Sequence, residues 1–188
     1  IPVFSLYGSV RHPSSQMLET FDVLLVDLQD IGTRIYTFTT TLIYMLEACA
    51  RTGKSVWVLD RPNPVGRPVE GMILEPGWES FVGAAPLIMR HGLTMGEIAS
   101  WYAAIRGLSL DLRVVEMQDY KPEQAPGFGW PSDSLSWVNP SPNASSLNMA
   151  RCFPGTVLIE GTTLSEGRGT SLPLELLGAP DIETEVVL

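Results

Sequence analysis

The chain has 188 residues, enough for one domain with a real hydrophobic core. Hydrophobic residues make up 45% and charged residues 18%, which is a globular composition, and no apolar run approaches the roughly 20 residues that cross a bilayer. The net charge of −9 argues against a nucleic acid or an anionic membrane as the partner.

The first residues, "IPVFSLYG", contain no initiator Met and no signal peptide, so we interpret the chain as part of a longer protein whose natural start is missing. Residues 3–7 resemble a short strand, and a short helix is expected near 15–20. The segment "DVLLVD" (22–27) is apolar on both faces, which is typical of a buried parallel strand.

A first long helix is predicted by an apolar stripe at i, i+3, i+4 and i+7, made by Leu42, Met45, Leu46 and Cys49. Possible N-caps are supplied by residues 39–41, all threonine, and Gly53 supplies the stop. A strand, "SVWVLD" (55–60), follows with the same apolar character as 22–27. The pattern in this half of the chain is therefore strand, helix, strand.

A second long helix begins with the capping-box spacing of Thr94 and Glu97 and ends at Gly107. Its predicted apolar stripe consists of Ile98, Trp101, Tyr102 and Ile105. Strands are predicted on either side of this helix and near the end of the chain, at 86–90 (the weakest), 112–117 and 156–161, with a further helix near 172–178.

This alternation predicts an α/β fold with right-handed crossovers and a mostly parallel sheet that carries helices on both faces. The stretch from about 119 to 154 is rich in Pro, Gly, Ser and Asn. It is long for a connection in a compact domain, and such loops are usually functional or mobile.

Ligands of open parallel sheets bind beyond the carboxyl ends of the strands, so the residues after each apolar run are candidates for a site. Three predicted strands end in a carboxylate, and the loop after each carries an arginine. The three pairs are Asp27 with Arg34, Asp60 with Arg61, and Glu160 with Arg168. This arrangement predicts one rim of acidic and cationic groups, as an enzyme for a polar substrate requires.

Structural roles compete with these functional ones. Asp27 and Asp60 could cap loops, and Glu160 could form a salt bridge with Arg168 or Arg34. Glu166 and Arg168 could be a solvated pair, although the neighbouring glycines suggest a close backbone approach to a loop or a ligand. His91 could act in catalysis or donate a structural hydrogen bond. "NPSPN" (139–143) suits sugar binding and loop bracing equally well.

Several chemistries lack their sequence signals. Two cysteines and two histidines show no spacing typical of a metal site. The glycine patterns of nucleotide-binding loops are absent, as is the "GxSxG" elbow of serine hydrolases. We therefore expect neither a metal nor a nucleotide cofactor.

Six blocks of the chain resemble, in order, the NamZ-like family of bacterial exo-β-N-acetylmuramidases. They are "DVLLVDLQDIGTRIYTF", "VLDRPNPVG" with "VEG", "RHGLTMGE", "PSPN", "FPGTVLIEGTTLSEGRGT" and "PLELLGAP". The resemblance covers nearly the whole chain. It implies a Rossmann-like domain joined to a smaller C-terminal subdomain, with the active site in the cleft between them and no cofactor. Residues 1–188 would then be a partial Rossmann-like domain, in which residues from about 119 onward contribute the loop region and the start of the second subdomain.

The resemblance also implies an activity, the release of N-acetylmuramic acid from the non-reducing end of peptidoglycan fragments. A glycosidase needs two carboxyl groups, and we expect Glu160 or Glu166 to supply one of them. Asp27, Asp30 or a glutamate in an upstream "GPEHG" loop, which this chain lacks, would supply the other. If that upstream glutamate is catalytic, this chain alone is incomplete.

The remaining family positions are expected to bind substrate, and the arginines among them could meet the lactyl carboxylate of muramic acid. These positions are Asp27, Gln29, Arg34, Tyr36, Asp60, Arg61, Asn63, Glu70, Arg90, His91, Ser141, Asn143 and Arg168. Thr163 stands where the family usually has Asn.

Two other functions stay open on the sequence. The chain could be a cell-wall sugar-binding module without catalysis, or an amidase or esterase on the same scaffold, although the second lacks its motifs. A cell-wall substrate favours a secreted or periplasmic protein, while a recycling role would be cytoplasmic, and no pattern indicates an oligomeric state.

Overall fold

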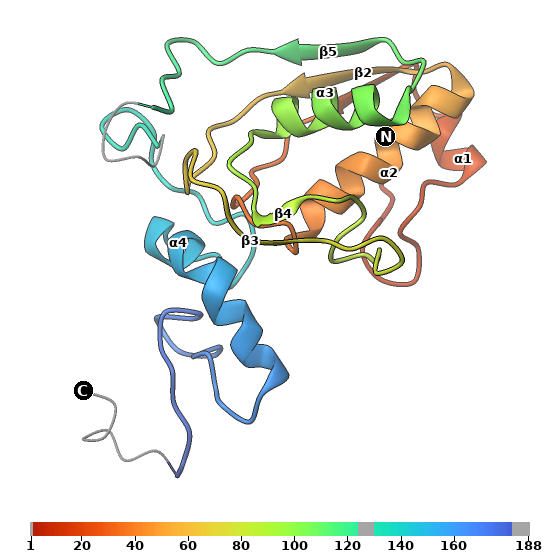
Figure 1. Cartoon of the computed structure of the whole chain (residues 1–188). Helices are drawn as coiled ribbons and strands as arrows, with labels where there is room; N and C mark the ends of the chain where they lie inside the picture. Colours follow the sequence, from red (N-terminus) through yellow and green to blue (C-terminus); the bar gives the residue numbers. More distant parts are fainter. Residues whose placement is uncertain (1, 124–129, 182–188) are drawn as a thin grey trace. The chain divides into compact units, whose positions relative to one another are not determined.

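The computed structural model in Figure 1 describes residues 2–123 and 130–181. The chain forms two compact units, Ile1–Trp130 and Pro131–Leu188. In the described residues, the first unit contains the sheets and the two long helices, and the second contains an α-helix, a 3-10 helix and turns. Among the described residues, no helix combines the length and the apolar character needed to cross a membrane.

The first unit is built on a parallel sheet of three strands in the order β1-β2-β5. These strands are β1 (Val23–Val26), β2 (Ser55–Leu59) and β5 (Leu112–Val115). They match the runs predicted at 22–27, 55–60 and 112–117, so the predicted α/β, Rossmann-like class is confirmed. Their carboxyl ends share one edge of the sheet, where the loops that follow β1, β2 and β5 begin.

The helices α2 (Thr37–Thr52) and α3 (Met95–Arg106) both cover the same face of this sheet (Figure 1). The strand order proceeds in one direction, so two right-handed crossovers place their helices on one side. The core lies between these two helices and the sheet. Its side chains without solvent exposure include Leu46, Val56, Val58 and Ile98. The predicted stripe from Leu42 to Cys49 faces this core.

The opposite face of the sheet is open in the described part of the chain. Val23 is 43% exposed, Leu25 58% and Val115 46%. The Arg113 guanidinium lies 5.0 Å from the centre of the Trp57 ring on this face. Helices were expected on both faces of the sheet, but in the described residues they cover one face only. Side chains alternate along a strand, so only every second residue of 22–27 is turned toward the covered face, and the expected complete burial of this segment was wrong.

Both long helices end in a left-handed glycine, Gly53 and Gly107, as predicted. The capping box of α3 is complete, since Thr94 Oγ1 accepts from Glu97 N–H and the Glu97 carboxylate accepts from Thr94 N–H. The predicted N-cap of α2 at 39–41 was wrong. The helix begins at Thr37, and its N-cap, Tyr36, makes no side-chain capping bond. Ile105, predicted to face the core, is 49% exposed.

A second sheet pairs β3 (Glu70–Ile73) antiparallel with β4 (Ile88–Arg90). The predicted strand at 86–90 thus exists but lies outside the parallel sheet. The predicted helix near 15–20 is α1 (Ser15–Leu18). Residues 3–7 form no strand and pair with no strand among the described residues, because a turn bonds Ser5 to Tyr7.

The second unit contains α4 (Leu147–Thr156), capped by Ser146, and a 3-10 helix, η1 (Val157–Gly161). The strand predicted at 156–161 was therefore wrong. Its three consecutive apolar residues are too few to separate strand from helix, and the described part of this unit offers only an isolated bridge, Ser165 with Gly178. Residues 173–175 form a turn, so the helix predicted at 172–178 was wrong as well.

Candidate functional site

Three loops meet at the carboxyl edge of the parallel sheet, namely those after β1 and β2 and the one between β4 and α3. Gln29 donates to the Pro62 carbonyl at 3.0 Å, and the Asn63 side chain donates to the Leu93 carbonyl at 3.0 Å. Gly32 has a φ of +78°, and a Cβ there would lie 2.2 Å from Val65 Cγ2. The loops are therefore held together at several points and leave no room for a larger residue at 32.

Two of the three carboxylates predicted to end a strand belong to this edge, and Asp27 is paired with Arg61 rather than with Arg34. Asp27 accepts from Arg61, with Oδ1 2.7 Å from Nε, and both side chains are about half exposed. Asp60 is the second carboxylate. The third, Glu160, does not end a strand, because it lies in η1 of the second unit.

Asp30 and His91 form a buried pair that links the β1 loop to the β4–α3 connection. His91 Nε2 lies 3.2 Å from Asp30 Oδ2, and their side chains are 1% and 5% exposed. His91 Nδ1 accepts from Leu93 N–H, so the proton of the neutral ring lies on Nε2 and faces the carboxylate, although this contact lacks the geometry of a regular hydrogen bond. Asp30 also accepts from Gly32 N–H at 2.7 Å. Each group is thus committed to holding the loops in place.

Arg34 lies on the other side of the same loop and is 8% exposed. Its Nη1 donates to the carbonyls of Met72 and Leu87, at 2.7 and 2.6 Å. Its Nε is buried and has no hydrogen-bond partner. Burial lowers the pKa of the guanidinium from its ordinary value, because desolvation disfavours the charged form.

Arg90 and Glu70 are brought together by the pairing of β3 with β4, where they stand opposite each other. The Arg90 guanidinium contacts the Glu70 carboxylate and also donates to the Val65 carbonyl. The arginine is mostly buried while the glutamate is 64% exposed. An isolated bridge also places Thr33 opposite Arg90, so this pair extends from the loop that holds Asp30.

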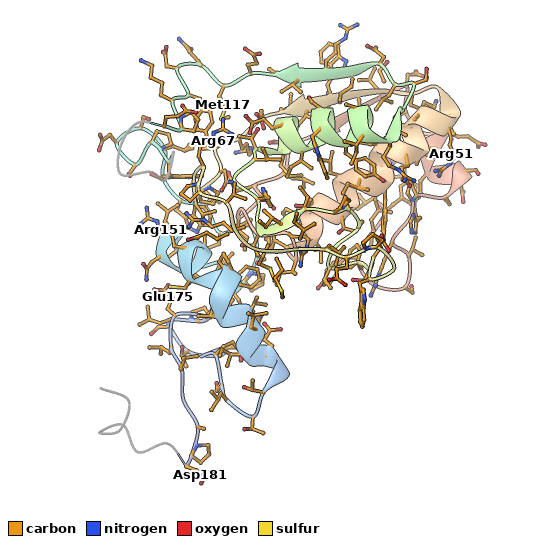
Figure 2. All side chains as sticks on the ribbon, in the orientation of Figure 1. Arg51, Arg67, Met117, Arg151, Glu175 and Asp181 are labelled. Atoms are coloured by element: carbon orange, nitrogen blue, oxygen red, sulfur yellow. The ribbon has the colours of Figure 1, made fainter. Side chains whose placement is uncertain are left out.

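A hollow of about 460 Å³ opens beside the carboxyl ends of β2 and β5, and Figure 2 shows Met117 and Arg67 at this end of the unit. It is lined by Asp60, Gly96, Glu97, Ser100, Val114, Glu116, Met117 and Tyr120. Asp60 accepts from Thr94 Oγ1 at 2.7 Å and from Gly96 N–H at 2.8 Å, at the start of α3. The capping role that competed with function for Asp60 is therefore real, although the residue also lines a hollow.

Sequence reasoning missed Arg67, whose Nη1 donates to Glu97 at 2.6 Å and to the Gly92 carbonyl at 3.1 Å. Burial opposes ionisation of Glu97, but the bonds from Arg67 and Thr94 outweigh it, so the pKa of Glu97 lies below its ordinary value. Tyr120, also missed, lies against Asn63 N–H at 3.4 Å, and burial raises the pKa of its hydroxyl. No local pattern marked either residue.

The second unit gathers the remaining charged candidates around one guanidinium. Arg168 Nε lies 3.1 Å from Glu160 Oε1 and 2.9 Å from Glu166 Oε1, so these two oxygens are no more than about 6 Å apart. The Glu160 side chain is 41% exposed and that of Glu166 only 12%. Of the two salt bridges that compete with a functional role for Glu160, the one with Arg168 is present.

The loop that carries Glu166 is tightly built. The backbone carbonyl of Glu166 accepts from Leu174 N–H at 2.6 Å, and the backbones of Ser165 and Gly178 each donate a hydrogen bond to the other. Gly167 has a φ of +80°, and a Cβ there would lie 3.1 Å from the Leu172 carbonyl oxygen. Of the flanking glycines, Gly167 makes the predicted close approach to another loop, while Gly161 and Gly169 have open space beside them.

The other predicted residues take up loop positions. Tyr36 packs against Phe38 with ring centres 4.8 Å apart. Ser141 and Asn143 lie in the second unit in a half-buried turn, where the Ser141 carbonyl accepts from Ala144 N–H and Trp137 Nε1 donates to the Ala144 carbonyl. Within residues 2–123 and 130–181, no group of three or more His, Cys, Asp or Glu is placed to hold a metal ion.

Family models match both parts of this chain. The model described as exo-beta-N-acetylmuramidase NamZ, N-terminal, covers residues 1–148, and its C-terminal counterpart covers 151–188. The chain belongs to the NamZ family. This membership agrees with the resemblance carried by the six sequence blocks.

One curated relative is the peptidoglycan beta-N-acetylmuramidase NamZ of Bacillus subtilis (strain 168), which is 44% identical over 185 residues. The match covers 98% of this chain and 44% of that protein. Two solved structures of DUF1343 family proteins from Bacteroides fragilis NCTC 9343 are also similar. At 35% identity each, their TM-scores are 0.88 and 0.80, over 98% and 91% of this chain and 48% and 47% of theirs. The NamZ-family chain thus spans less than half the length of these relatives.

Proposed function

We propose that this chain is part of an exo-β-N-acetylmuramidase, a glycoside hydrolase that releases N-acetylmuramic acid from the non-reducing end of peptidoglycan fragments. Family membership and the muramidase activity named for the Bacillus subtilis relative support this activity. Because the chain spans less than half of that relative, the complete activity belongs to the longer protein. Peptidoglycan fragments are accordingly the proposed substrates.

The observation that carries the proposal is the pair of carboxylates held on Arg168. Glycoside hydrolysis needs one carboxyl group that gives a proton and one that stays ionised as base or nucleophile. Glu166 is nearly buried, lies in a braced loop and contacts a permanent cation. We therefore give Glu166 the ionised role, since a carboxylate paired with a guanidinium is poorly suited to donate a proton.

The proton donor is then a second carboxyl group. Glu160 shares the same guanidinium, Asp27 is paired with Arg61, and Asp30 is enclosed with His91. These pairings favour a donor from the segment that family members carry upstream, where the resemblance implies a glutamate. Among the described residues, Asp30 would then act by holding the β1 loop rather than by touching substrate.

The test is hydrolysis of a chromogenic β-N-acetylmuraminide by this chain and by a chain extended to the length of its relatives. We expect activity in the extended chain alone, and a loss of kcat on the order of 10²- to 10⁴-fold on Glu166→Gln. The matched control is Glu19→Gln, which changes an exposed glutamate at the end of α1 and should leave kcat unchanged.

A parental rate in the Glu166→Gln variant would remove Glu166 from the mechanism, and the same test on Glu160→Gln applies to its neighbour. An extended chain that binds N-acetylmuramic acid but cleaves no muraminide would instead support a sugar-binding module.

A further inference from the structure

Arg34 is a buried cation without a buried anion. The residue is only 8% exposed, and no carboxylate among the described residues lies in salt-bridge contact with it. Burying an unpaired charge is costly, so such groups are usually paired with a counter-charge or bind a ligand. The other arginines of the predicted site each have a carboxylate partner, which is Asp27 for Arg61, Glu70 for Arg90 and Glu160 for Arg168.

The guanidinium of Arg34 is fixed from one side only. Nη1 donates to the carbonyls of Met72 and Leu87, which sets the plane of the group. Nε is buried without a partner, and no described residue accepts a hydrogen bond from Nη2. The free edge, Nε with Nη2, is the edge that presents two parallel N–H groups and matches the two oxygens of a carboxylate.

Gly83 is a neighbour of this free edge. A Cβ on Gly83 would lie 3.6 Å from Arg34 Nε and 3.3 Å from Leu74 Cδ2, so a side chain at this position would contact the donor. Gly83 itself lies in a turn in which Ser80 and Gly83 bond to each other in both directions. The position of Gly83 beside Nε is therefore fixed by the backbone.

We propose that the Nε–Nη2 edge of Arg34 binds a ligand carboxylate, and that this carboxylate is the lactyl group that distinguishes N-acetylmuramic acid from N-acetylglucosamine. The assignment of the lactyl group rests on the proposed muramidase function, whereas the carboxylate site rests on the geometry of Arg34 alone. Arg34 is then a specificity-determining residue, because a sugar without the lactyl group leaves the buried cation unpaired.

The first experiment measures binding of D-lactate and of lactamide, its uncharged analogue, to this chain by NMR titration. We expect D-lactate to bind and lactamide not to bind. Arg34→Lys keeps the charge but removes the two-pronged donor, and we expect it to weaken D-lactate binding by roughly 10- to 100-fold.

A second variant guards against misfolding of the first. Gly83→Ala places a methyl group in contact with Nε and leaves the bonds from Nη1 untouched, so it should weaken D-lactate binding while the chain keeps its fold. The matched control is Arg51→Gln, an exposed arginine in the last turn of α2, which Figure 2 shows at the opposite end of the unit from Arg67. It should bind D-lactate like the parent.

The second experiment uses the extended chain and compares kcat/KM for β-N-acetylmuraminide and β-N-acetylglucosaminide substrates. We expect Arg34→Lys to lower the preference for the muraminide by roughly 10-fold or more, mainly through KM. If the parent hydrolyses neither substrate, the muramidase proposal fails, while the D-lactate titration still tests the carboxylate site.

Three outcomes would overturn the inference: no D-lactate binding, equal binding by Arg34→Lys, or an unchanged muraminide preference in that variant. D-lactate that binds this chain but not the extended chain would show that a carboxylate of the longer protein, and not of the substrate, occupies the edge.

Discussion

Cys49 and Cys152 are the thiols of the chain, and their surroundings give them different reactivities. Cys49 is fully buried in the apolar face of α2, as its place in the stripe predicted. Burial raises its pKa to about 11, although Lys54 opposes the shift. Cys152, in α4, is half buried, and burial together with Glu175 raises its pKa from the ordinary value.

Thiol labelling at pH 8 should therefore separate the two cysteines. We expect iodoacetamide to modify Cys152 first and Cys49 only after unfolding in urea, because a buried protonated thiol is neither accessible nor nucleophilic. Mass spectrometry of the digested chain identifies the site. Modification of Cys49 at the rate of Cys152 in the native chain would contradict the burial of the α2 stripe.

Single residues also show what sequence patterns do not carry. Asp30 and His91 were both chosen as site residues, but their contact joins positions 61 apart and depends on how the loops meet. The orientation of Arg34 toward backbone carbonyls of β3 and of the segment before β4 has the same origin. Residue type predicted the candidates, while three-dimensional placement decides which of them brace loops and which face ligand.

At the scale of elements, the start of α3 connects a helix cap to the candidate site. Glu97 completes the capping box and accepts from Arg67, and Asp60 binds the same first turn through Thr94 and Gly96. A Cβ at Gly96 would lie 2.5 Å from Val114 Cγ1 and 2.9 Å from the Asp60 carboxyl carbon. The helix therefore approaches the sheet edge as closely as a glycine allows.

Glu97→Gln should destabilise the chain in a pH-dependent way. The pKa of Glu97 is below its ordinary 4.5, so the ionised form contributes stability above pH 4.5, and the contribution is lost as the pH falls through the lower native value. We expect a loss of about 0.5–1 kcal/mol at pH 7 in urea unfolding, a small value because the side chain is partly exposed and screened by solvent.

The difference between parent and Glu97→Gln should shrink steadily as the pH falls below 4.5. Arg67→Gln provides the control, since the effect of Glu97→Gln should be smaller in that background, where the main ion-pair partner is missing. A difference that stays constant from pH 7 to pH 3 would mean that the charge of Glu97 contributes nothing.

Elements with strong local signals were predicted, and those without were not. β1, β2 and β5 carry apolar runs, and α2 and α3 carry stripes and glycine stops. β3 has the sequence "EGMI" and is exposed along its whole length, so no periodicity marked it. The run at 157–159 is apolar, but it lies in η1, which directly follows α4. The cap of α4, Ser146, lies too far upstream of this run for the sequence pattern to connect the two.

At the scale of the whole molecule, the parallel sheet has two unequal faces. The face under α2 and α3 contains the core, and the other leaves Val23, Leu25 and Val115 largely exposed. Parallel sheets are usually covered on both faces, so the open one is unusual for its class. Substitutions on the two sides should consequently have very different effects on the free energy of unfolding.

Leu46→Ala and Leu25→Ala test this inequality with the same chemical change. Leu46 has no exposure, and its truncation should cost about 2–5 kcal/mol through lost burial and a cavity. Leu25 is 58% exposed, and its truncation should cost less than about 1 kcal/mol. Urea unfolding measures both, and equal losses would mean that the second face is covered in solution.

The pairing of β2 with β5 has a consequence for how fast the chain folds. Val56 stands beside Leu112, so this ladder closes a loop that contains both antiparallel strands and all of α3. Closing such a loop costs entropy before any contact repays it, and parallel ladders between distant segments are slow to form. During synthesis, the edge that bears Asp60 therefore remains unfinished until β5 has emerged, and the hollow beside it is complete only once the residues after β5, up to Tyr120, have followed.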